Sequence, residues 1–349
     1  RIVERLMIPV AVTIRQHRIE ANQQAEANAA MGLGALLAAR WDICADTIHS
    51  GGGLHAQWRN DFDADGYTSE RDMAYHFAAV VPFVELAGAY EHVGVKLFDR
   101  NFKRLFDAPV AYAPDQRPGG PPAVYLAAYE HYRDPAYLPR VRDALDRWSL
   151  EAMTSPLDPE AVTSRAGEHG LTNSVLEASG YTVLRSDATG ELVAVTMNWA
   201  SPSKRNGRAV FDTLALWRGK PLTLQTGRIG YGYKQSHFSY APIACNTVVV
   251  DGENHSMLRA EQVAMLEGDL PAARWLSPVQ RPLYDGVEWA RTAAVAGNTV
   301  VIIDQLRSDQ PRRFDWVTYP GGKVTGTTIV GEPADCSDFA ALHDQGVGY

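Results

Sequence analysis

The hydrophobic pattern of this chain changes its period once, and that change restricts the fold more than any other feature of the sequence. Up to about residue 150, apolar residues recur at steps of three and four over 25–37 and 73–87, as they do on one face of an α-helix. Pro82 should kink the second of these helices or split it in two. Residues 123–132 and 135–153 are typical of a further helical pair. The first part of the chain is therefore predicted to be helical.

From about residue 171 the apolar residues follow a period of two instead. Short β-branched or alternating runs are separated by Gly, Asn, Asp and Pro, and they lie at 192–197, 208–216, 246–250 and 299–303. Because no helix-length pattern lies between most of them, the strands should pair antiparallel rather than through βαβ units. The sequence predicts a two-domain α+β protein, with a helical domain over 1–154, a linker over 155–170 and an antiparallel β domain over 171–349.

Composition and charge exclude several classes of protein. The 349 residues carry 33 lysines and arginines against 41 aspartates and glutamates, so the net charge of −8 gives no bulk field that would attract nucleic acid. No run approaches the roughly 20 apolar residues of a membrane helix, and three cysteines are too few for a disulfide framework. The chain begins with arginine rather than methionine, and we expect it to be a fragment or a processed form.

Several short motifs follow one another in a fixed order. In the predicted β domain they are Ser-Gly-Tyr-Thr-Val-Leu-Arg at 179–185, Arg-Ala-Val-Phe-Asp-Thr-Leu at 208–214, Cys-Asn-Thr-Val-Val-Val-Asp-Gly at 245–252, and Asp304 followed by Arg-Phe-Asp-Trp at 313–316. In the helical part, Asn-Gln-Gln stands at 22–24, and Asp65-Gly66 precedes Glu-Arg-Asp-Met-Ala-Tyr-His at 70–76. In order and spacing, these motifs resemble those of the heparinase II/III-like polysaccharide lyases.

The resemblance implies an (α/α) toroid, here incomplete, followed by an antiparallel β-sandwich. Family members cut uronic-acid polysaccharides by β-elimination, so the resemblance also implies an anionic polysaccharide as the partner and a periplasmic or secreted location. The reaction needs a group that neutralises the uronate carboxylate, a base for the C5 proton and an acid for the departing 4-oxygen. No nucleic acid or membrane is expected as a partner, and a homo-oligomeric state stays open.

The resemblance points to three catalytic candidates. Tyr75 stands where the family has a tyrosine that protonates the leaving oxygen and, in some members, also removes the C5 proton. Arg208 replaces a family histidine that faces the substrate; its permanent charge suits a carboxylate, but an arginine cannot act as a base. The role of the base then falls on Tyr75, or on Tyr231 or Tyr233 in a glycine-spaced loop.

The remaining candidates are polar residues that we expect to contact the sugar chain. They are Asn22, Gln24, Arg71, His76, Tyr233 and His237. An amide at a helix start can bind a carboxylate where free N–H groups and the helix dipole add positive potential, although simple capping is the alternative for Asn22. Arg71 is expected one helical turn before Tyr75, and His76 points about 100° away from Tyr75. A structural role therefore competes with substrate contact at His76, and His255 is expected in an exposed turn.

The zinc ligands that some family members carry are missing from this chain. If 208–216 is a strand, Arg208, Val210 and Asp212 share one of its faces. In zinc-binding members the ligand positions correspond to Val210, Thr226 and Cys245 here. Valine cannot bind a metal and threonine is a poor ligand, which leaves one thiolate where zinc needs three or four donors. We therefore expect no metal and no other cofactor.

Three other functions stay open at the level of the sequence. A polymer-level uronate C5-epimerase shares the proton abstraction but forms no unsaturated product. A non-catalytic carbohydrate-binding relative is favoured by the loss of family histidines at positions 208, 210 and 245, whereas the presence of Asn22 and Tyr75 favours an enzyme. A glycoside hydrolase on a helical toroid is a lesser alternative, because no pair of acidic residues stands out.

Overall fold

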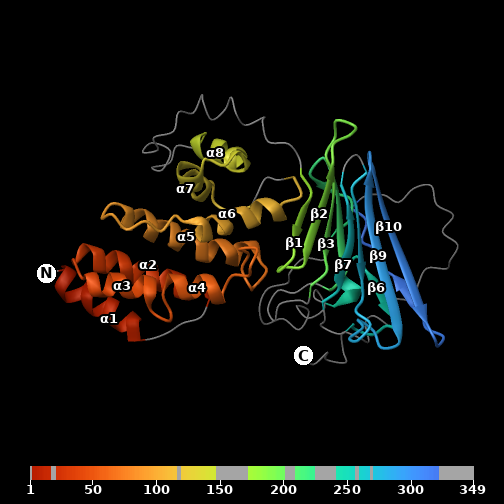
Figure 1. Ribbon diagram of the computed structural model, residues 1–349, viewed down its shortest axis with the longest axis horizontal. Coiled ribbons are helices and arrows are strands. Elements are labelled where there is room, and N and C mark those ends of the chain that lie inside the picture. The colour runs from red at the N-terminus through yellow and green to blue at the C-terminus, as the bar shows by residue number, and fades with distance from the viewer. Residues whose placement is uncertain are drawn as a thin grey trace. The chain divides into compact units, whose positions relative to one another are not determined.

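The computed structural model describes residues 2–16, 21–115, 119–146, 172–200, 209–224, 241–255, 259–267 and 270–321. The chain divides into two compact units, Arg1–Gly170 and Leu171–Tyr349. Among the described residues, every α-helix lies in the first unit and every named strand in the second (Figure 1). The predicted fold class, helices followed by antiparallel sheets, is confirmed.

The helical unit is built from helices of short and medium length. They are η1 (Val3–Met7), α1 (Ile8–Gln16), α2 (Ala21–Leu37), α3 (Trp41–His49), α4 (Leu54–Asn60), α5 (Met73–Glu91), α6 (Arg100–Tyr112), α7 (Pro122–Tyr132), η2 (Pro135–Tyr137) and α8 (Leu138–Leu145). The expected pair at 123–132 and 135–153 corresponds to α7 and α8, and the last residues of that range lie outside the described part of the chain.

Helix α5 supplies much of the core of the helical unit. It runs through Pro82 as one helix, so of the two effects expected of this proline, a kink or a split, the split is wrong. Its buried side chains include Phe77, Val80, Phe83 and Leu86, which belong to one hydrophobic cluster with residues of the surrounding helices. Contrary to the sequence-based expectation, α5 is long and apolar enough to cross a membrane by length and composition alone. Here its apolar side chains fill the helical core.

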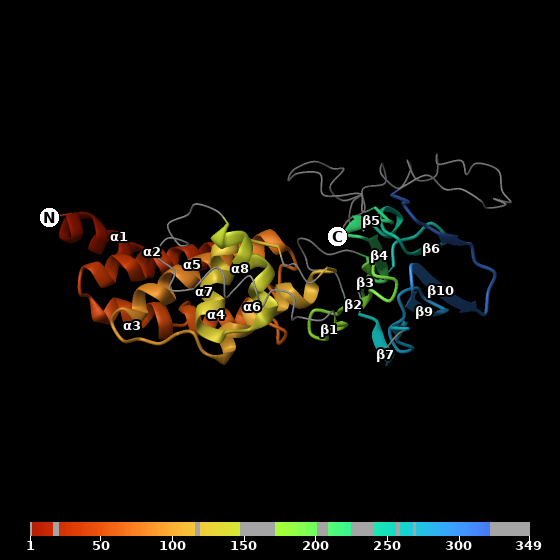
Figure 2. The same ribbon diagram turned by 90° about the horizontal axis from the view of Figure 1, so that it is seen from above.

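Helices α2 and α5 pack closely against each other (Figure 2). The contact depends on Gly32 of α2, where an added Cβ would lie 2.5 Å from Leu86 Cδ1 and 2.8 Å from the Tyr90 hydroxyl. A larger residue at this position would therefore require the Leu86 and Tyr90 side chains to move.

The β unit is made of antiparallel strands arranged in sheets. The strands are β1 (Ser174–Leu176), β2 (Tyr181–Ser186), β3 (Val193–Asn198), β4 (Asp212–Trp217), β5 (Lys220–Pro221), β6 (Val248–Val250), β7 (Glu261–Leu266), β8 (Ala272–Leu276), β9 (Val287–Ala296), β10 (Thr299–Ser308) and β11 (Phe314–Trp316), with a short helix η3 (Pro242–Ala244) before β6. Within the described residues the sheet orders are β1-β2-β3-β4-β5, β10-β9-β8-β7 and β11-β6. All pairs are antiparallel, as the sequence predicted.

A single core lies between the two larger sheets. Val195 and Met197 of β3 meet Trp275 of β8 and Trp289 of β9 in one buried cluster. The predicted strand over 208–216 begins only at Asp212, because the residue before it has left-handed backbone geometry, with a φ of 63°. The expectation that Val210 and Asp212 share one strand face is therefore wrong, and Arg208 lies outside the described residues.

Candidate functional site

The N-terminal ends of α2 and α5 are connected by a chain of buried amides. Gln24 Nε2 donates to Asn28 Oδ1 at 3.1 Å, and Asn28 Nδ2 donates to Gln57 Oε1 at 2.8 Å. Gln57 Nε2 then donates to Asp61 Oδ2 at 3.2 Å, and the Asp61 carbonyl accepts from the Ser69 N–H at 2.8 Å. Because Ser69 stands four residues before α5, this network ties the start of α2 to the approach to α5.

The two amides predicted to bind substrate differ in their surroundings. Asn22 is the second residue of α2 and is half-buried, whereas Gln24 is buried and belongs to the amide network. Asn22 thus keeps side-chain surface for a ligand, and Gln24 helps to hold the helix that carries it.

The loop before α5 is a tight turn that requires glycine. Asp63 Oδ1 accepts from the backbone N–H groups of Asp65 at 3.0 Å and Tyr67 at 3.1 Å. Gly66 has a φ of 87°, and a Cβ there would lie 2.4 Å from the Arg104 carbonyl oxygen of α6. The Asp-Gly motif therefore has a structural reason: only glycine permits both this backbone geometry and this approach.

Tyr75 lies in the first turn of α5 and is half-buried. The turn is held by its N-cap, Asp72, whose side chain accepts from the N–H groups of Ala74 at 2.8 Å and Tyr75 at 3.2 Å. Arg71 precedes this cap and has a φ of 54°, so it is not on the helix. The prediction that Arg71 stands one helical turn before Tyr75 is wrong, although both residues lie at the same end of α5.

His76 is fully buried in the helical core. Its ring stacks on Tyr67 with 5.1 Å between centroids, and its Nε2–H donates to the Leu105 carbonyl at 2.8 Å. Pro109 of α6 has no N–H, so the Leu105 carbonyl four residues earlier lacks its usual helical donor. His76 replaces that donor from another helix, which favours the structural alternative for this residue over contact with substrate.

Burial lowers the pKa of His76 from 6.5 to about 4, although its hydrogen bond to Leu105 opposes the shift. The unfolded chain therefore binds a proton at a higher pH than the folded protein does, and stability present above pH 6.5 should be lost as the pH falls towards 4. We expect the free energy of unfolding to fall by about 3 kcal/mol over this interval through His76. Urea titrations at several pH values should show that the free energy of unfolding depends less on pH in His76→Phe than in the native protein. An equal pH dependence in the two proteins would contradict this role.

In the β unit, the start of β4 and the Cys-Asn-Thr segment before β6 are joined through backbone groups. The Val210 N–H donates to His255 Nε2 at 3.0 Å, and Thr247 Oγ1 donates to the Val210 carbonyl at 3.3 Å. The Asn246 N–H donates to Asp212 Oδ1 at 2.9 Å. His255 is buried, so the expectation of an exposed turn residue is wrong; its ring accepts a backbone N–H inside the domain.

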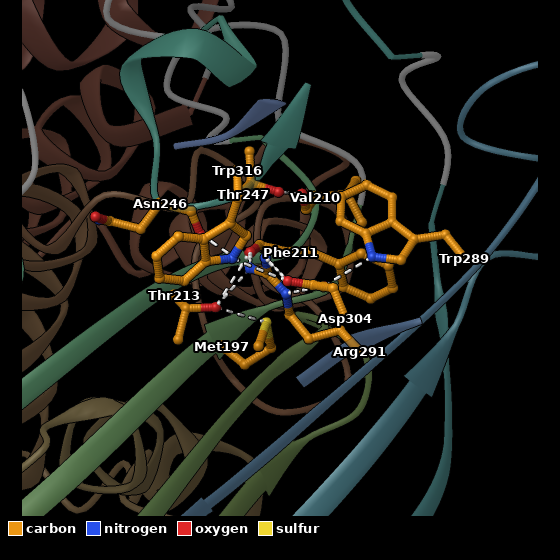
Figure 3. Close-up of polar contacts among 10 residues, drawn as sticks. All are labelled: Met197, Val210, Phe211, Thr213, Asn246, Thr247, Trp289, Arg291, Asp304 and Trp316. Carbon is orange, nitrogen blue, oxygen red and sulfur yellow. Dashed lines mark hydrogen bonds and ion pairs between the residues drawn. The ribbon is translucent and has the colours of Figure 1, made fainter. Parts of the chain in front are cut away.

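An ion pair between Arg291 of β9 and Asp304 of β10 lies beneath this junction (Figure 3). Arg291 is only 1% exposed, and its Nε and Nη2 donate to the two Asp304 oxygens, each at 2.7 Å. Its Nη1 donates to the Phe211 carbonyl, to Thr213 Oγ1 at 3.0 Å and to the Asn246 carbonyl at 2.9 Å. One guanidinium thus positions both segments that carry the family motifs.

Two indole N–H groups also donate hydrogen bonds to the Asp304 carboxylate. Trp289 Nε1 donates to Oδ1 at 2.8 Å and Trp316 Nε1 donates to Oδ2 at 3.0 Å, so both N–H groups are directed at the carboxylate (Figure 3). Arg291 was not found from the sequence, because an isolated arginine in an alternating strand gives no local signal. Asp304 and Trp316 were noted only as parts of a motif.

The residues at the family zinc positions do not fit a metal. The Val210 side chain is fully buried in the hydrophobic core, and Cys245 is also buried. Thr226 lies outside the described residues. Within the described part of the chain, no group of three or more His, Cys, Asp or Glu side chains is placed to hold a metal ion.

Arg208, Tyr231, Tyr233 and His237 lie outside the residues that the structure describes. Of the candidates, the structure places Asn22, Gln24, Arg71, Tyr75 and His76, all in the helical unit.

Comparison with known proteins finds a similar fold over both units. The family model described as heparinase II/III-like, C-terminal, matches residues 170–335. Among solved structures, the heparan sulfate lyase HepC from Pedobacter heparinus is 16% identical, with a TM-score of 0.61 over 86% of this chain and 48% of that one. The heparinase III-BT4657 gene product is 14% identical, with a TM-score of 0.60 over 87% of this chain and 48% of that one.

A structure of heparinase III is 13% identical, with a TM-score of 0.59 over 86% of this chain and 49% of that one. The chain therefore spans about half the length of the solved structures that it matches. No curated protein sequence matches it. Residues 170–335 therefore match the C-terminal domain model of the heparinase II/III-like family, and across its helical and β units the chain has the fold of these solved structures.

Proposed function

We propose that this chain acts in a polysaccharide lyase that cleaves a uronic-acid-containing polysaccharide by β-elimination. The observation that carries the proposal is that the likeness to a heparan sulfate lyase covers 86% of the chain, and so includes both the helical and the β unit. The substrate would be an anionic polymer, which implies a periplasmic or secreted location.

In the proposed reaction, Asn22 and Arg208 neutralise the uronate carboxylate, so that the C5 proton becomes acidic. A base removes that proton, the electron pair of the C5–H bond forms the C4–C5 double bond, and the bond to the 4-oxygen breaks. Tyr75 donates the proton that the departing oxygen takes up, and either Tyr75 itself or Tyr231 serves as the base. The capped first turn of α5, with a half-buried tyrosine, supports this assignment.

A second candidate is a carbohydrate-binding relative without activity. It is favoured by the burial of Val210 and Cys245, which stand where the family has histidines and which here serve as core residues. The two candidates can be distinguished because only the lyase would form an unsaturated sugar.

The test is to incubate the full chain with heparan sulfate, chondroitin sulfate, hyaluronan, alginate and glucuronan and to follow the ultraviolet absorbance of the C4–C5 double bond. We expect absorbance to rise with one polymer and to be unchanged by a metal chelator, because the residues at the family zinc positions do not form a ligand set. Activity that the chelator abolishes and zinc restores would contradict the metal-free proposal. No absorbance with any polymer, combined with incorporation of solvent deuterium at C5, would show an epimerase instead.

A further inference from the structure

Trp316 of β11 combines high exposure with a fixed orientation. Its side chain is 57% exposed, yet its Nε1 donates to Asp304 Oδ2 at 3.0 Å. Asp304 is itself held by two hydrogen bonds of 2.7 Å from Arg291, which is almost fully buried. The indole is thus anchored to the core of the β unit by its polar edge (Figure 3), although the residue as a whole is exposed.

A second aromatic ring extends this surface along the same strand. Phe314 is 39% exposed, and because side chains alternate along a strand it shares a face with Trp316. β11 pairs antiparallel with the buried strand β6, with Trp316 opposite Val248 and Phe314 opposite Val250. The two positions are about 6.6 Å apart along a strand of regular rise.

The charged groups near this strand are engaged with one another. Arg313 Nε donates to Asp315 Oδ2 at 2.8 Å, and Arg312 Nη1 donates to Asp251 Oδ2 at 2.8 Å. These ion pairs leave ring faces, rather than net charge, as the main feature that β11 presents to a ligand.

We propose that Trp316, extended by Phe314, is a stacking platform for a sugar ring of the polysaccharide; neither residue is one of the candidate catalytic residues. The identity of the ligand rests on the proposed function, since Trp316 lies within the matched family domain at 170–335. Aromatic rings suit ligands with an apolar face and polar edges, as the C–H face and the hydroxyls of a pyranose provide. Because Asp304 already fixes the indole, little side-chain entropy is lost when the sugar binds.

The test compares Trp316→Ala and Trp316→Phe with Trp41→Ala, a matched control on α3 with 58% exposure. Binding of the five polymers is measured by affinity electrophoresis and calorimetry, both with the native chain and in the Tyr75→Phe background, where cleavage cannot remove the ligand. We expect Trp316→Ala to raise Kd about tenfold, equivalent to about 1.4 kcal/mol, within the range seen for stacked rings. Trp316→Phe keeps a ring but loses the hydrogen bond to Asp304, so its loss of affinity should be smaller than that of Trp316→Ala. Trp41→Ala should bind the polymer as the native protein does.

Salt distinguishes stacking from attraction of a polyanion. The Kd of Trp316→Ala divided by the Kd of the native protein should be the same at low and high salt, because salt does not screen stacking. An unchanged Kd, or a ratio that falls to one at high salt, would overturn the platform. A Trp316→Ala variant that changes molar mass in light scattering but binds polymer normally would assign the ring to an interface between copies instead.

The outcomes also separate this inference from the proposed function. Cleavage with normal binding by Trp316→Ala overturns only the platform. Binding that depends on Trp316 without any unsaturated product overturns only the lyase. Absence of binding to every polymer by the native chain overturns both.

Discussion

Tyr75→Phe is expected to lower the rate of unsaturated-product formation by about 10²- to 10⁴-fold, the range for loss of a general acid or base. The substitution removes only the hydroxyl, and the ring keeps its half-buried place in the first turn of α5. Because Asp72 caps that turn through backbone N–H groups, the helix start does not depend on the hydroxyl. The effect should therefore appear in kcat, measured by the ultraviolet assay, with little change in thermal stability.

The control for this prediction is Tyr132→Phe, which removes the hydroxyl of another half-buried tyrosine in the helical unit. Its hydroxyl donates to the Asp99 carbonyl at 3.0 Å, so the variant is expected to lose some stability but no activity. Equal activity of Tyr75→Phe and the native protein would remove Tyr75 from the mechanism. The acid and base roles would then fall to Tyr231 or Tyr233.

Arg291→Met should destabilise the protein by about 3–5 kcal/mol, the usual effect of breaking a buried ion pair. The substitution leaves the buried Asp304 carboxylate without its cation. It also removes the donor that the Phe211 and Asn246 carbonyls share. Urea unfolding followed by tryptophan fluorescence is a suitable measurement, because Trp289 donates directly to the same carboxylate.

Arg312→Met is the matched control for Arg291→Met. Arg312 makes an ion pair of 2.8 Å with Asp251, but both side chains are 32% exposed, so the expected loss is below about 1 kcal/mol. Similar losses for the two variants would show that burial does not determine the contribution of Arg291. The double variant Arg291→Met with Asp304→Leu should recover part of the loss, since no unpaired charge remains buried.

Much of the helix and strand content could be predicted from the local hydrophobic pattern. The helical period over 25–37 corresponds to α2 at Ala21–Leu37, and the alternating run at 299–303 corresponds to β10 at Thr299–Ser308. The apolar run from 73 corresponds to α5, which Pro82 does not split in two, because a buried proline within a well-packed helix need not end it. Helices α3, α4 and α6 were not predicted. The first two are short, whereas α6 carries a helical stripe at Phe102, Leu105, Phe106 and Val110 that was not recognised from the sequence.

The candidate site was harder to predict from the sequence, because its chemistry depends on partners distant in the chain. His76 is a core residue because its ring stacks on Tyr67 and donates to the Leu105 carbonyl, which Pro109 in the same distant helix leaves without its usual donor. The strand expected over 208–216 begins late because Phe211 adopts a positive φ, with its carbonyl bound by Arg291. Neither feature has a signature within its own segment.

The sequence by itself determined that the first part of the chain is helical and the second antiparallel, since a hydrophobic period is a local property that each segment carries. Motif order likewise pointed to the heparinase II/III-like family, which the match over 170–335 supports. Only the tertiary structure decided which polar residues are buried and which are open: His76 and His255 lie in the interior, whereas Trp316 is anchored at the surface. The physical reason is that hydrogen bonding and burial depend on contacts between segments far apart in the chain, which local spacing does not encode.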